Sequence, residues 1–459
     1  MSDTGPPRYL ICGRKDGLGS RLANLVWSWR LARRIDARLL SFWPTDEING
    51  GKGLDVREIF DEDQLAAAPL CGELEIIRGR WDKHFRALPV DFDEQTFCDP
   101  LPLVVAAQLN QRIKASVPVL RGWRGPLWLE GETVWNAVVD AGRLLGRLPV
   151  HPRVRAALDQ ASRDQALSRT IAVHIRRGDV VRHLRTVAEA FASDPDAMRV
   201  RFKAATEHFF LRCAPLEAYA RSVEPLLAKG YEVLVCTDSP ELSERLAGLM
   251  SRRPRFAQSL APPGLSAAQT ALFDLLLMRQ CHAVVGARSA FSLLAAYAGS
   301  GRLFDPNASA TVQELISTYR EVLGPKARAL LADTSMLQIV LRQLRKCSSS
   351  EALAMTEDAA VRELVSRPAD PQPPGPAGDP AKVWSDLFRS QTKAWHGLAE
   401  QFMRAGDLGG ELEARGRALD IDDGDLKAHG RMARLLTALR RPTEADQHLR
   451  VLRAAGRDV

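Results

Sequence analysis

The sequence predicts an α/β protein built from two parallel, doubly wound halves and followed by a small helical domain. Near the N-terminus, a short apolar strand opens into a glycine loop and a helix. From about residue 169, strands and helices alternate again, and a proline-rich segment then precedes two helical repeats. The 459 residues exceed the roughly 250–300 that a single core sustains, so we expect two or three domains.

The first half starts with a strand over residues 7–12, the glycine loop 13–19 and a helix over residues 20–35, in which apolar residues recur at helical spacing. A second strand is predicted over residues 37–42, and apolar runs follow at 73–77 and 101–107. We assign residues 1–160 to this first α/β domain.

In the second half, residues 161–325, β-branched and apolar runs predict strands that alternate with amphipathic helices, as in a parallel sheet. The predicted strands cover residues 170–175, 231–236 and 283–286, and the predicted helices cover residues 215–228, 266–281 and 290–298. Two such halves in series predict a cleft between them.

Residues 326–366 read as a helical extension, and residues 367–380, RPADPQPPGPAGDP, as a linker, because proline removes donors and locks φ. In residues 381–459, Trp395, Ala399 and Phe402 recur 34 positions later as His429, Ala433 and Leu436. A 34-residue helical period resembles the tetratricopeptide repeat. Two copies are fewer than stacking normally needs, so a plain pair of helical hairpins is the alternative.

The composition of the chain argues against several classes of protein and kinds of site. Hydrophobic residues make up 46% and charged residues 26%, and no apolar run approaches the roughly 20 residues that span a bilayer, so we expect no integral membrane segment. The N-terminus lacks a secretory pattern, which favours the cytoplasm.

The seven cysteines are scattered without CxxC spacing, which favours reduced, buried thiols over disulfides or a zinc site. The net charge of +7 forms no long basic tract, so nucleic acid is not an expected partner.

The most informative segment is HIRRGD, residues 174–179, at the end of a predicted strand. Arg176 and Arg177 offer planar donor forks that suit a diphosphate. The alternative is an arginine paired with Asp179, which itself could orient an arginine or accept from a sugar hydroxyl. Asp179 is not expected to bind a metal, because no DxD triplet or histidine cluster lies nearby.

The glycine loop contains Gly17, Gly19 and Arg21, and it lets the backbone approach a ligand at a helix N-terminus. Its spacing fits neither a dinucleotide fingerprint nor a Walker loop. A simple tight turn is the alternative.

Further candidates follow in the second half. Asp238 comes directly after a strand, Asp274 lies within a helix, and Ser289, Phe291 and Ser292 begin another helix. Hydroxyls and amides at a helix N-terminus donate to phosphate, and a carboxylate can accept the paired donors of guanine. Each position also has a structural reading as a turn former, a helix carboxylate or an N-cap.

In this order, the motifs GLGSRL, HIRRGD, CTDS, DLLLMRQC and SAFSLLAA resemble those of the fucosyltransferase superfamily, which includes α-1,2-, α-1,6- and protein O-fucosyltransferases. The likeness covers residues 8–310 through short motifs. It implies a GT-B fold in which residues 1–160 form an acceptor-side Rossmann-like domain and residues 161–325 bind GDP-fucose. It also implies inversion at the anomeric carbon, with no required metal and no cofactor.

By the same resemblance, Arg176 supports the departing diphosphate, with His174, Arg177, Asp179 and Asp238 shaping the nucleotide-sugar site. The remaining roles are also carried over: guanine recognition by Asp274, phosphate and base contacts by Ser289, Phe291 and Ser292, and a sugar or acceptor border by Gly17, Gly19 and Arg21.

The expected activity is fucosyl transfer from GDP-fucose to a glycan or protein acceptor. The alternatives are a different GDP-sugar, or an inactive scaffold that acts through its helices by binding a protein partner or by self-association. Two features depart from the family pattern: Ser20-Arg21, where many members carry Asn, and an arginine-rich insertion at residues 180–210. No residue identifies itself as the catalytic base.

Overall fold

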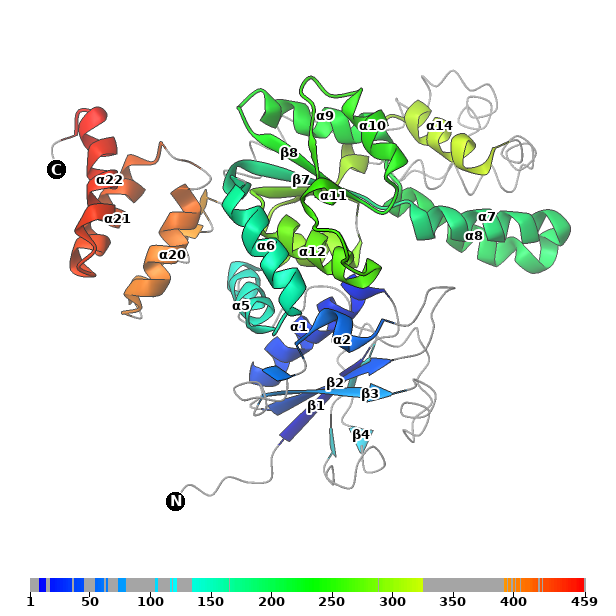
Figure 1. Ribbon diagram of the computed structural model, residues 1–459, viewed down its shortest axis with the longest axis horizontal. Coiled ribbons are helices and arrows are strands. Elements are labelled where there is room, and N and C mark those ends of the chain that lie inside the picture. Colours follow the sequence, from blue (N-terminus) through cyan, green and yellow to red (C-terminus); the bar gives the residue numbers. More distant parts are fainter. Residues whose placement is uncertain are drawn as a thin grey trace, which may run out of the picture. The chain divides into compact units, whose positions relative to one another are not determined.

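A computed structural model of the chain defines the fold (Figure 1). The predicted extension at 326–366 and the linker at 367–380 lie outside the described residues. The structure describes residues 8–13, 17–34, 37–44, 54–61, 63–64, 73–79, 104–105, 116–117, 119–121, 134–164, 166–287, 289–324, 392–393, 395–397, 399–400, 402–404, 406–419, 422 and 424–457.

The N-terminal part contains a four-stranded parallel sheet in the order β3-β2-β1-β6. Its strands are β1 (Arg8–Gly13), β2 (Ala37–Pro44), β3 (Leu74–Gly79) and β6 (Val119–Arg121). In the predicted run at 101–107, the structure describes residues 104–105, which form the strand β4 (Val104–Val105) and pair antiparallel with β5 (Ser116–Val117). The strand–loop–helix start is confirmed, because α1 (Leu18–Arg34) follows β1.

The second sheet has five parallel strands in the order β11-β10-β7-β8-β9. Its strands are β7 (Thr170–Ile175), β8 (Glu232–Thr237), β9 (Arg255–Phe256), β10 (Ala283–Gly286) and β11 (Leu303–Phe304). All six residues of β7 are buried, as expected for a central strand of a parallel sheet covered on both faces. The predicted parallel α/β architecture is therefore confirmed here.

Several helices of this part begin at a residue whose side chain caps them. For example, Ser266 and Gln269 form a capping box at the start of α12, and Thr311 and Glu314 form another at the start of α14. The helices of this part are α9 (Leu216–Leu227), α10 (Glu241–Ala247), α11 (Ala257–Leu260), α12 (Ala267–Gln280), α13 (Ala290–Tyr297) and α14 (Val312–Leu323), with short 3₁₀ turns at Leu167–Arg169 and Pro306–Ser309.

The two sheets share one hydrophobic core. Buried side chains from α1, β8 and α12, such as Leu22, Leu234 and Leu275, belong to the same cluster, which also takes in α2 (Val56–Ile59), α5 (Val134–Arg147) and α6 (Pro152–Asp164). Arg279 of α12 donates to the carbonyls of Gly142 and Ala298, each at 2.9 Å, and so joins α5, α12 and α13.

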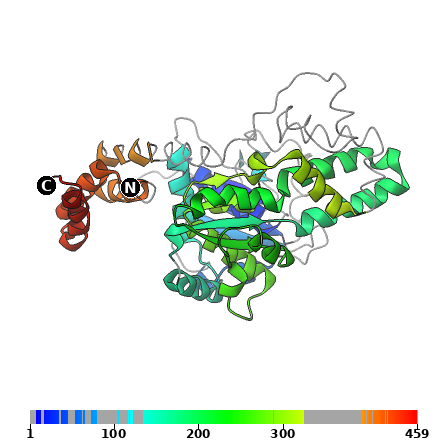
Figure 2. The same cartoon turned by 90° about the horizontal axis from the view of Figure 1, so that it is seen from above.

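The insertion at residues 180–210, which has no assigned pattern in the sequence, forms two helices that run side by side away from the sheet (Figure 1, Figure 2). They are α7 (Gly178–Ser193) and α8 (Pro195–Arg212). Asp194 caps α8 through the amide of Ala197 at 3.1 Å, and Phe191 stacks on Phe202 with ring centroids 4.9 Å apart. The Asp-Pro pair at 194–195 was the local signal for this second helix.

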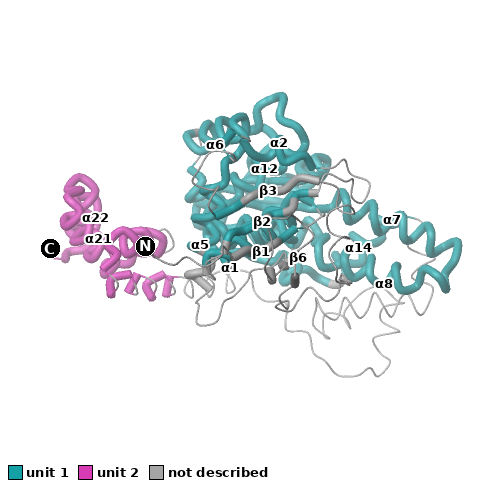
Figure 3. Tube along the Cα trace, turned by 90° about the horizontal axis from the view of Figure 1, so that it is seen from below, with its two compact units in different colours: residues 1–132, 137–377 teal, residues 133–136, 378–459 magenta. Residues whose placement is uncertain are grey.

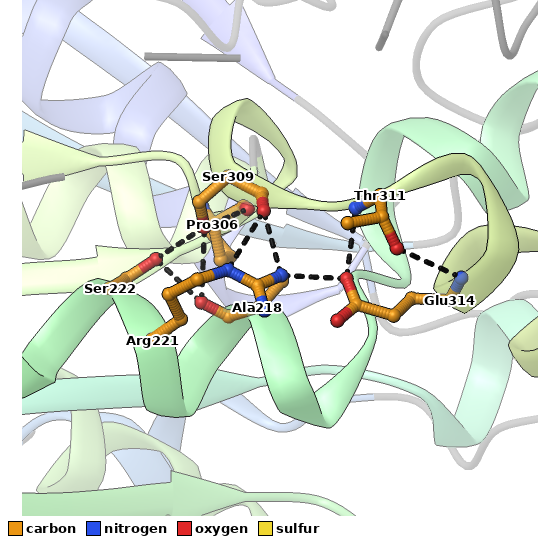
Figure 4. A network of polar contacts seen from close by, with 7 residues as sticks. All are labelled: Ala218, Arg221, Ser222, Pro306, Ser309, Thr311 and Glu314. Carbon is orange, nitrogen blue, oxygen red and sulfur yellow. Dashed lines mark hydrogen bonds and ion pairs between the residues drawn. The ribbon is translucent and has the colours of Figure 1, made fainter. Parts of the chain in front are cut away.

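The chain forms two compact units, residues 1–132 with 137–377 and residues 133–136 with 378–459 (Figure 3). Both sheets belong to the first unit. Within it, a polar network ties α9 to the turn at Pro306–Ser309 and to α14 (Figure 4). Arg221 donates to the carbonyl of Ser309 at 2.8 Å and to Glu314 at 2.7 Å, and the hydroxyls of Ser222 and Ser309 are 2.9 Å apart.

The second unit includes α20 (Leu408–Leu419), α21 (Leu426–Ala438) and α22 (Pro442–Ala454). Of the residues that define the 34-residue period, Trp395, Ala399, His429, Ala433 and Leu436 are buried, whereas Phe402 is half-buried. Glu411 is fully buried and accepts from Arg415 at 2.9 Å and from Arg431 at 2.7 Å, which links α20 to α21. The assignment as a tetratricopeptide repeat stays a prediction.

Four of the seven cysteines lie in the described part of the chain, and Cys12, Cys213, Cys236 and Cys281 are all free and buried. The expectation that the thiols are buried is confirmed for these four. Within the described segments, no helix combines the length and the hydropathy that crossing a bilayer requires.

Candidate functional site at the carboxyl edge of the second sheet

The candidate residues of the second half gather at one edge of the five-stranded sheet. In the register, His174 on β7 pairs with Gly286 on β10 and with Cys236 on β8, so the ends of the three strands lie together. The chain runs from β7 to β8 on one side and returns to β10 on the other, so the strand order reverses between β7 and β10. Open α/β sheets bind their ligands at such a switch point.

Arg176 directly follows β7 and is paired with Asp179 in the first turn of α7. Its Nε donates to Oδ1 at 2.9 Å, and its Nη2 donates to Oδ2. Burial opposes the charge of both groups, but their pairing outweighs it, raising the pKa of Arg176 and lowering the pKa of Asp179. The paired arrangement considered as an alternative is therefore present, and the Arg176 side chain remains 25% exposed.

Asp238 holds the loop after β8 against the loop after β7. Its carboxylate accepts from the backbone N–H groups of Arg177 at 3.0 Å and Gly178 at 3.1 Å, where α7 begins. The first amides of a helix lack partners within the helix, so this carboxylate satisfies two of them. A Cβ atom on Gly178 would lie 2.9 Å from Oδ2 of Asp238, so the approach requires a glycine.

Arg177 points into the protein. Its side chain is buried, and Nη2 donates to the carbonyl of Ala214 at 3.1 Å. Its Nε has no hydrogen-bond partner among the described residues. Arg177 therefore anchors the segment after α8 to the end of β7, and one of its donors remains unsatisfied.

A buried hydrogen-bonded chain runs from β7 to the start of α13. Nδ1 of His174 lies 2.7 Å from the hydroxyl of Ser292, which lies 2.9 Å from the hydroxyl of Ser289. Ser289 caps α13 by accepting from the amide of Ser292 at 3.1 Å. Burial, reinforced by the positive charge of Arg176, lowers the pKa of His174 to about 3, so the ring is neutral.

Phe291 covers this chain. Its ring stacks on His174 with centroids 5.0 Å apart. A Cβ atom on Gly286, at the end of β10, would lie 2.9 Å from the Ser292 hydroxyl and 3.4 Å from Cβ of His174. Gly286 thus leaves the space in which Ser292 reaches His174, a requirement that the sequence motifs did not reveal.

Asp274 supplies the most unusual group of the site. It lies on α12, and its Oδ1 is buried without a hydrogen-bond partner in the described part of the chain. Burial raises its pKa to about 7, and its charge in turn acts on Cys236 at the end of β8. Buried polar groups are normally satisfied, and exceptions concentrate at functional positions. Asp274 therefore has an acceptor oxygen available for a ligand.

The N-terminal loop meets the second half at Phe291. A Cβ atom on Gly19 would lie 2.8 Å from Cα of Phe291, whereas Gly17 is exposed with nothing within 4 Å. Arg21 is buried, and its guanidinium carbon lies 5.3 Å from the ring centroid of Trp43. Gly17 thus borders open space, while Gly19 and Arg21 are engaged in packing.

Other residues near this edge were not among the sequence candidates. The hydroxyl of Tyr219 on α9 donates to the carbonyl of His174 at 3.1 Å. His208 and Arg212 lie on the last turns of α8, and their charges act on Asp179. Their spacing of four residues at the end of a helix was the one available signal. The described residues contain no group of three or more histidine, cysteine or acidic side chains placed to hold a metal ion.

Comparison of the sequence with protein-family models finds no match, and comparison with curated proteins finds none either. Solved structures do show similarity. The α-1,6-fucosyltransferase NodZ, in a crystal soaked with GDP-fucose, has 17% identity and a TM-score of 0.36, covering 64% of this chain and 93% of NodZ. NodZ from Bradyrhizobium, in a separate structure, has 16% identity and the same TM-score of 0.36, with 63% and 91% covered.

POFUT1 in complex with GDP has 12% identity and a TM-score of 0.35, with 70% of this chain and 98% of POFUT1 covered. Similarity at this level assigns no activity to the chain, so a functional proposal has to rest on the residues of the site. The solved structures named above are fucosyltransferases.

Proposed function

We propose that this protein is an inverting, metal-independent glycosyltransferase of the GT-B type that transfers fucose from GDP-fucose to a glycan or protein acceptor. The observation that carries the proposal is the buried, unpartnered carboxylate oxygen of Asp274. Guanine presents N1–H and N2–H as two parallel donors, which a carboxylate can accept together. Such an acceptor, together with Arg176 and the N-terminus of α13, would suit a guanine nucleotide with a diphosphate.

Arg176 would contact the diphosphate. Its Nε and Nη2 already donate to the two oxygens of Asp179, and two oxygens of a phosphate could accept from the same pair of donors. As the sugar leaves, negative charge builds up on the β-phosphate, and a fixed guanidinium stabilises that charge without reorganising. This is the support that the proposed mechanism assigns to Arg176 in place of a metal ion.

The start of α13 would hold the remaining phosphate oxygens. Its first amides and the hydroxyls of Ser289 and Ser292 lie at the switch point, and the neutral His174 fixes Ser292 from behind. Phe291 offers an apolar edge to the ligand. Gly17 leaves room on the opposite side, where a sugar or an acceptor would lie.

The proposed reaction is a single displacement. The acceptor hydroxyl oxygen forms a bond to the anomeric carbon on the face opposite the diphosphate, and the bond between that carbon and the β-phosphate oxygen breaks. GDP leaves with the electron pair, and the hydroxyl proton passes to a general base. The sequence and the described site do not single out that base.

Calorimetric titration of the full chain with GDP, GDP-fucose and UDP, in the presence of a chelator, tests the proposal. We expect GDP to bind and UDP to bind far more weakly, because UDP lacks the two donors that Asp274 would accept. Arg176→Ala is expected to weaken GDP binding about 10- to 100-fold, since charged hydrogen bonds are lost. The control is Arg199→Ala, which changes an exposed arginine on α8. A folded protein that binds no GDP would exclude the proposal.

The donor sugar is a separate question, because guanine and sugar contacts involve different residues. A panel of GDP-sugars tested for transfer to simple glycans distinguishes fucose from another GDP-sugar. Turnover with a different sugar alone would retain the fold and the nucleotide site but change the activity.

The second unit favours one additional role. A cavity of about 660 Å³ lies against α21 and α22 and is lined by the basic residues Lys427, Arg434 and Arg457 and by apolar residues such as Leu426 and Leu452. This mixed basic and apolar lining suits a protein segment that combines carboxylates with leucine-like side chains. If such a segment is bound, charge reversal at Arg434 should abolish binding of an acidic leucine-containing peptide and leave GDP affinity unchanged.

A further inference from the structure

The α7–α8 hairpin is attached directly to the arginine loop of the site. Cys213, at the end of α8, lies with its Sγ 3.6 Å from the carbonyl of Arg176, and Arg177 donates to the carbonyl of Ala214 at 3.1 Å. The last turns of α8 are thus held beside the loop that follows β7. Side chains on that end of the helix can act on the same ligand as Arg176.

His208 and Arg212 occupy this end of α8. They are four residues apart and so share one face of the helix. The neighbours that lower the pKa of Asp179 are Arg176, Arg212 and His208, all of them basic side chains. Asp179 therefore lies among cations contributed by both the arginine loop and the hairpin.

Asp179 is also the more exposed partner of its ion pair, since 57% of its side chain is accessible against 25% for Arg176. Its two oxygens accept from Nε and Nη2 of Arg176 and so occupy this edge of the guanidinium, at which a phosphate would also bind. Asp238 cannot replace it, because its carboxylate is committed to the amides of Arg177 and Gly178. A diphosphate that uses the Nε–Nη2 edge has to displace Asp179.

We propose that Arg176, Arg212 and His208 together form one anion-binding surface, called the anion wall below. Asp179 is an internal anion that occupies this wall until a diphosphate displaces it. The inference rests on the proposed function only in taking a diphosphate as the ligand. Asp179 then turns from Arg176 toward Arg212 as the ligand binds. The insertion between β7 and α9 thereby becomes part of the donor site.

The pH response of His208 follows from its surroundings. Burial, together with Arg212, Arg176 and His183, lowers its pKa to about 4, and Asp179 is the acidic neighbour that opposes this. A bound diphosphate adds negative charge and favours the protonated ring. Binding should therefore take up a proton through His208, and the affinity should rise as the pH falls.

Calorimetric titration with inorganic pyrophosphate, without metal, tests the wall independently of the nucleotide. We expect Arg212→Gln to weaken pyrophosphate binding about tenfold and Asp179→Asn to strengthen it about tenfold, because each changes one charge-assisted contact. Arg199→Gln, on the distal part of the hairpin, should change nothing. Circular dichroism of each variant checks that it is folded.

The pH dependence of pyrophosphate binding is tested with His208→Gln. Wild-type affinity for pyrophosphate should increase relative to this variant between pH 7.5 and 5.5. The proposal fails if Arg212→Gln binds like the wild type, if Asp179→Asn binds no more tightly, or if neither wild type nor Asp179→Asn binds pyrophosphate.

Parallel titrations with GDP separate this proposal from the proposed function. If the pyrophosphate results hold but GDP binds no better than pyrophosphate, the anion wall stands and the guanine site fails. If GDP binds specifically but Arg212→Gln and Asp179→Asn leave its affinity unchanged, only the wall fails.

Discussion

Gly19 and Phe291 pack backbone against backbone: a Cβ atom on Gly19 would lie 2.8 Å from Cα of Phe291 and 2.9 Å from its Cβ. Gly19 lies at the start of α1, which follows β1, and Phe291 lies at the start of α13, which follows β10. The N-terminal glycine loop and the start of α13, where the proposed phosphate site lies, are therefore in direct contact. The two backbones can approach this closely because Gly19 has no side chain.

Gly19→Ala should destabilise the first unit by about 1–3 kcal/mol, because the methyl group overlaps backbone atoms that cannot move freely. Gly17→Ala is the matched control, since nothing lies within 4 Å of a Cβ there, and its effect should stay within about 0.5 kcal/mol. Urea unfolding followed by the fluorescence of the buried Trp27, Trp29 and Trp43 measures both. Equal stabilities of the two variants would contradict this contact.

Asp274→Asn should stabilise the free protein while weakening guanine binding. The folded-state pKa of about 7 lies above the ordinary 3.8, so the folded state keeps a proton that the unfolded state releases. Stability from this group is therefore lost as the pH rises from about 4 to 7. At pH 8 the variant should be more stable by about 1–3 kcal/mol, the cost of an unsatisfied buried group.

The matched control is Asp159→Asn on the exposed side of α6, which should alter neither property. Thermal unfolding and GDP titration at pH 6 and pH 8 provide the measurements. If Asp274→Asn binds GDP as tightly as the wild type, the Asp274 carboxylate does not bind the guanine base.

Mild acid should destabilise the first unit through two buried histidines. Burial lowers the pKa of His174 and of His282 to about 3, whereas both rings accept a proton near pH 6.5 when unfolded. Stability is thus lost as the pH falls below about 6.5, by up to about 1.4 kcal/mol per pH unit for each ring.

Urea unfolding between pH 6.5 and 5, where most carboxylates remain ionised, checks this slope. His174→Gln should remove one ring's share of the pH dependence. An unchanged slope in His174→Gln would show that the ring is not held neutral.

Glu411→Gln should destabilise the helical unit by about 3 kcal/mol, because two arginines lose the charge that faces them in a buried position. Burial raises the pKa of Glu411, but the bonds from Arg431 and Arg415 outweigh it, and the net pKa is lowered. The stabilisation is present above the ordinary pKa of 4.5 and is lost as the pH falls through the lower folded value.

Glu413→Gln, an exposed neighbour on the same helix, serves as the control and should stay within about 0.5 kcal/mol. Hydrogen exchange of α20 and α21 follows the unit separately from the two sheets. Equal exchange in both variants would mean that Glu411 does not hold the helices together.

The strands and helices of the second sheet could be predicted from the sequence because their signals are local. A β-branched run became β7, and Ser266 with Gln269 started α12 as a capping box. The hairpin α7–α8 was overlooked, because its mixed charges hide the buried positions that include Phe191 and Phe202. Strands of two residues, such as β9 and β11, carry too little pattern to be recognised.

Sequence order alone was enough to name the candidate side chains, because motifs at the carboxyl ends of parallel strands meet at one edge. Their partners depend on tertiary packing. Asp179 lies on Arg176, Asp238 on the first amides of α7, and Asp274 faces no partner among the described residues. These differences arise from burial and from the distances between elements that are far apart in the chain, and no local pattern encodes them.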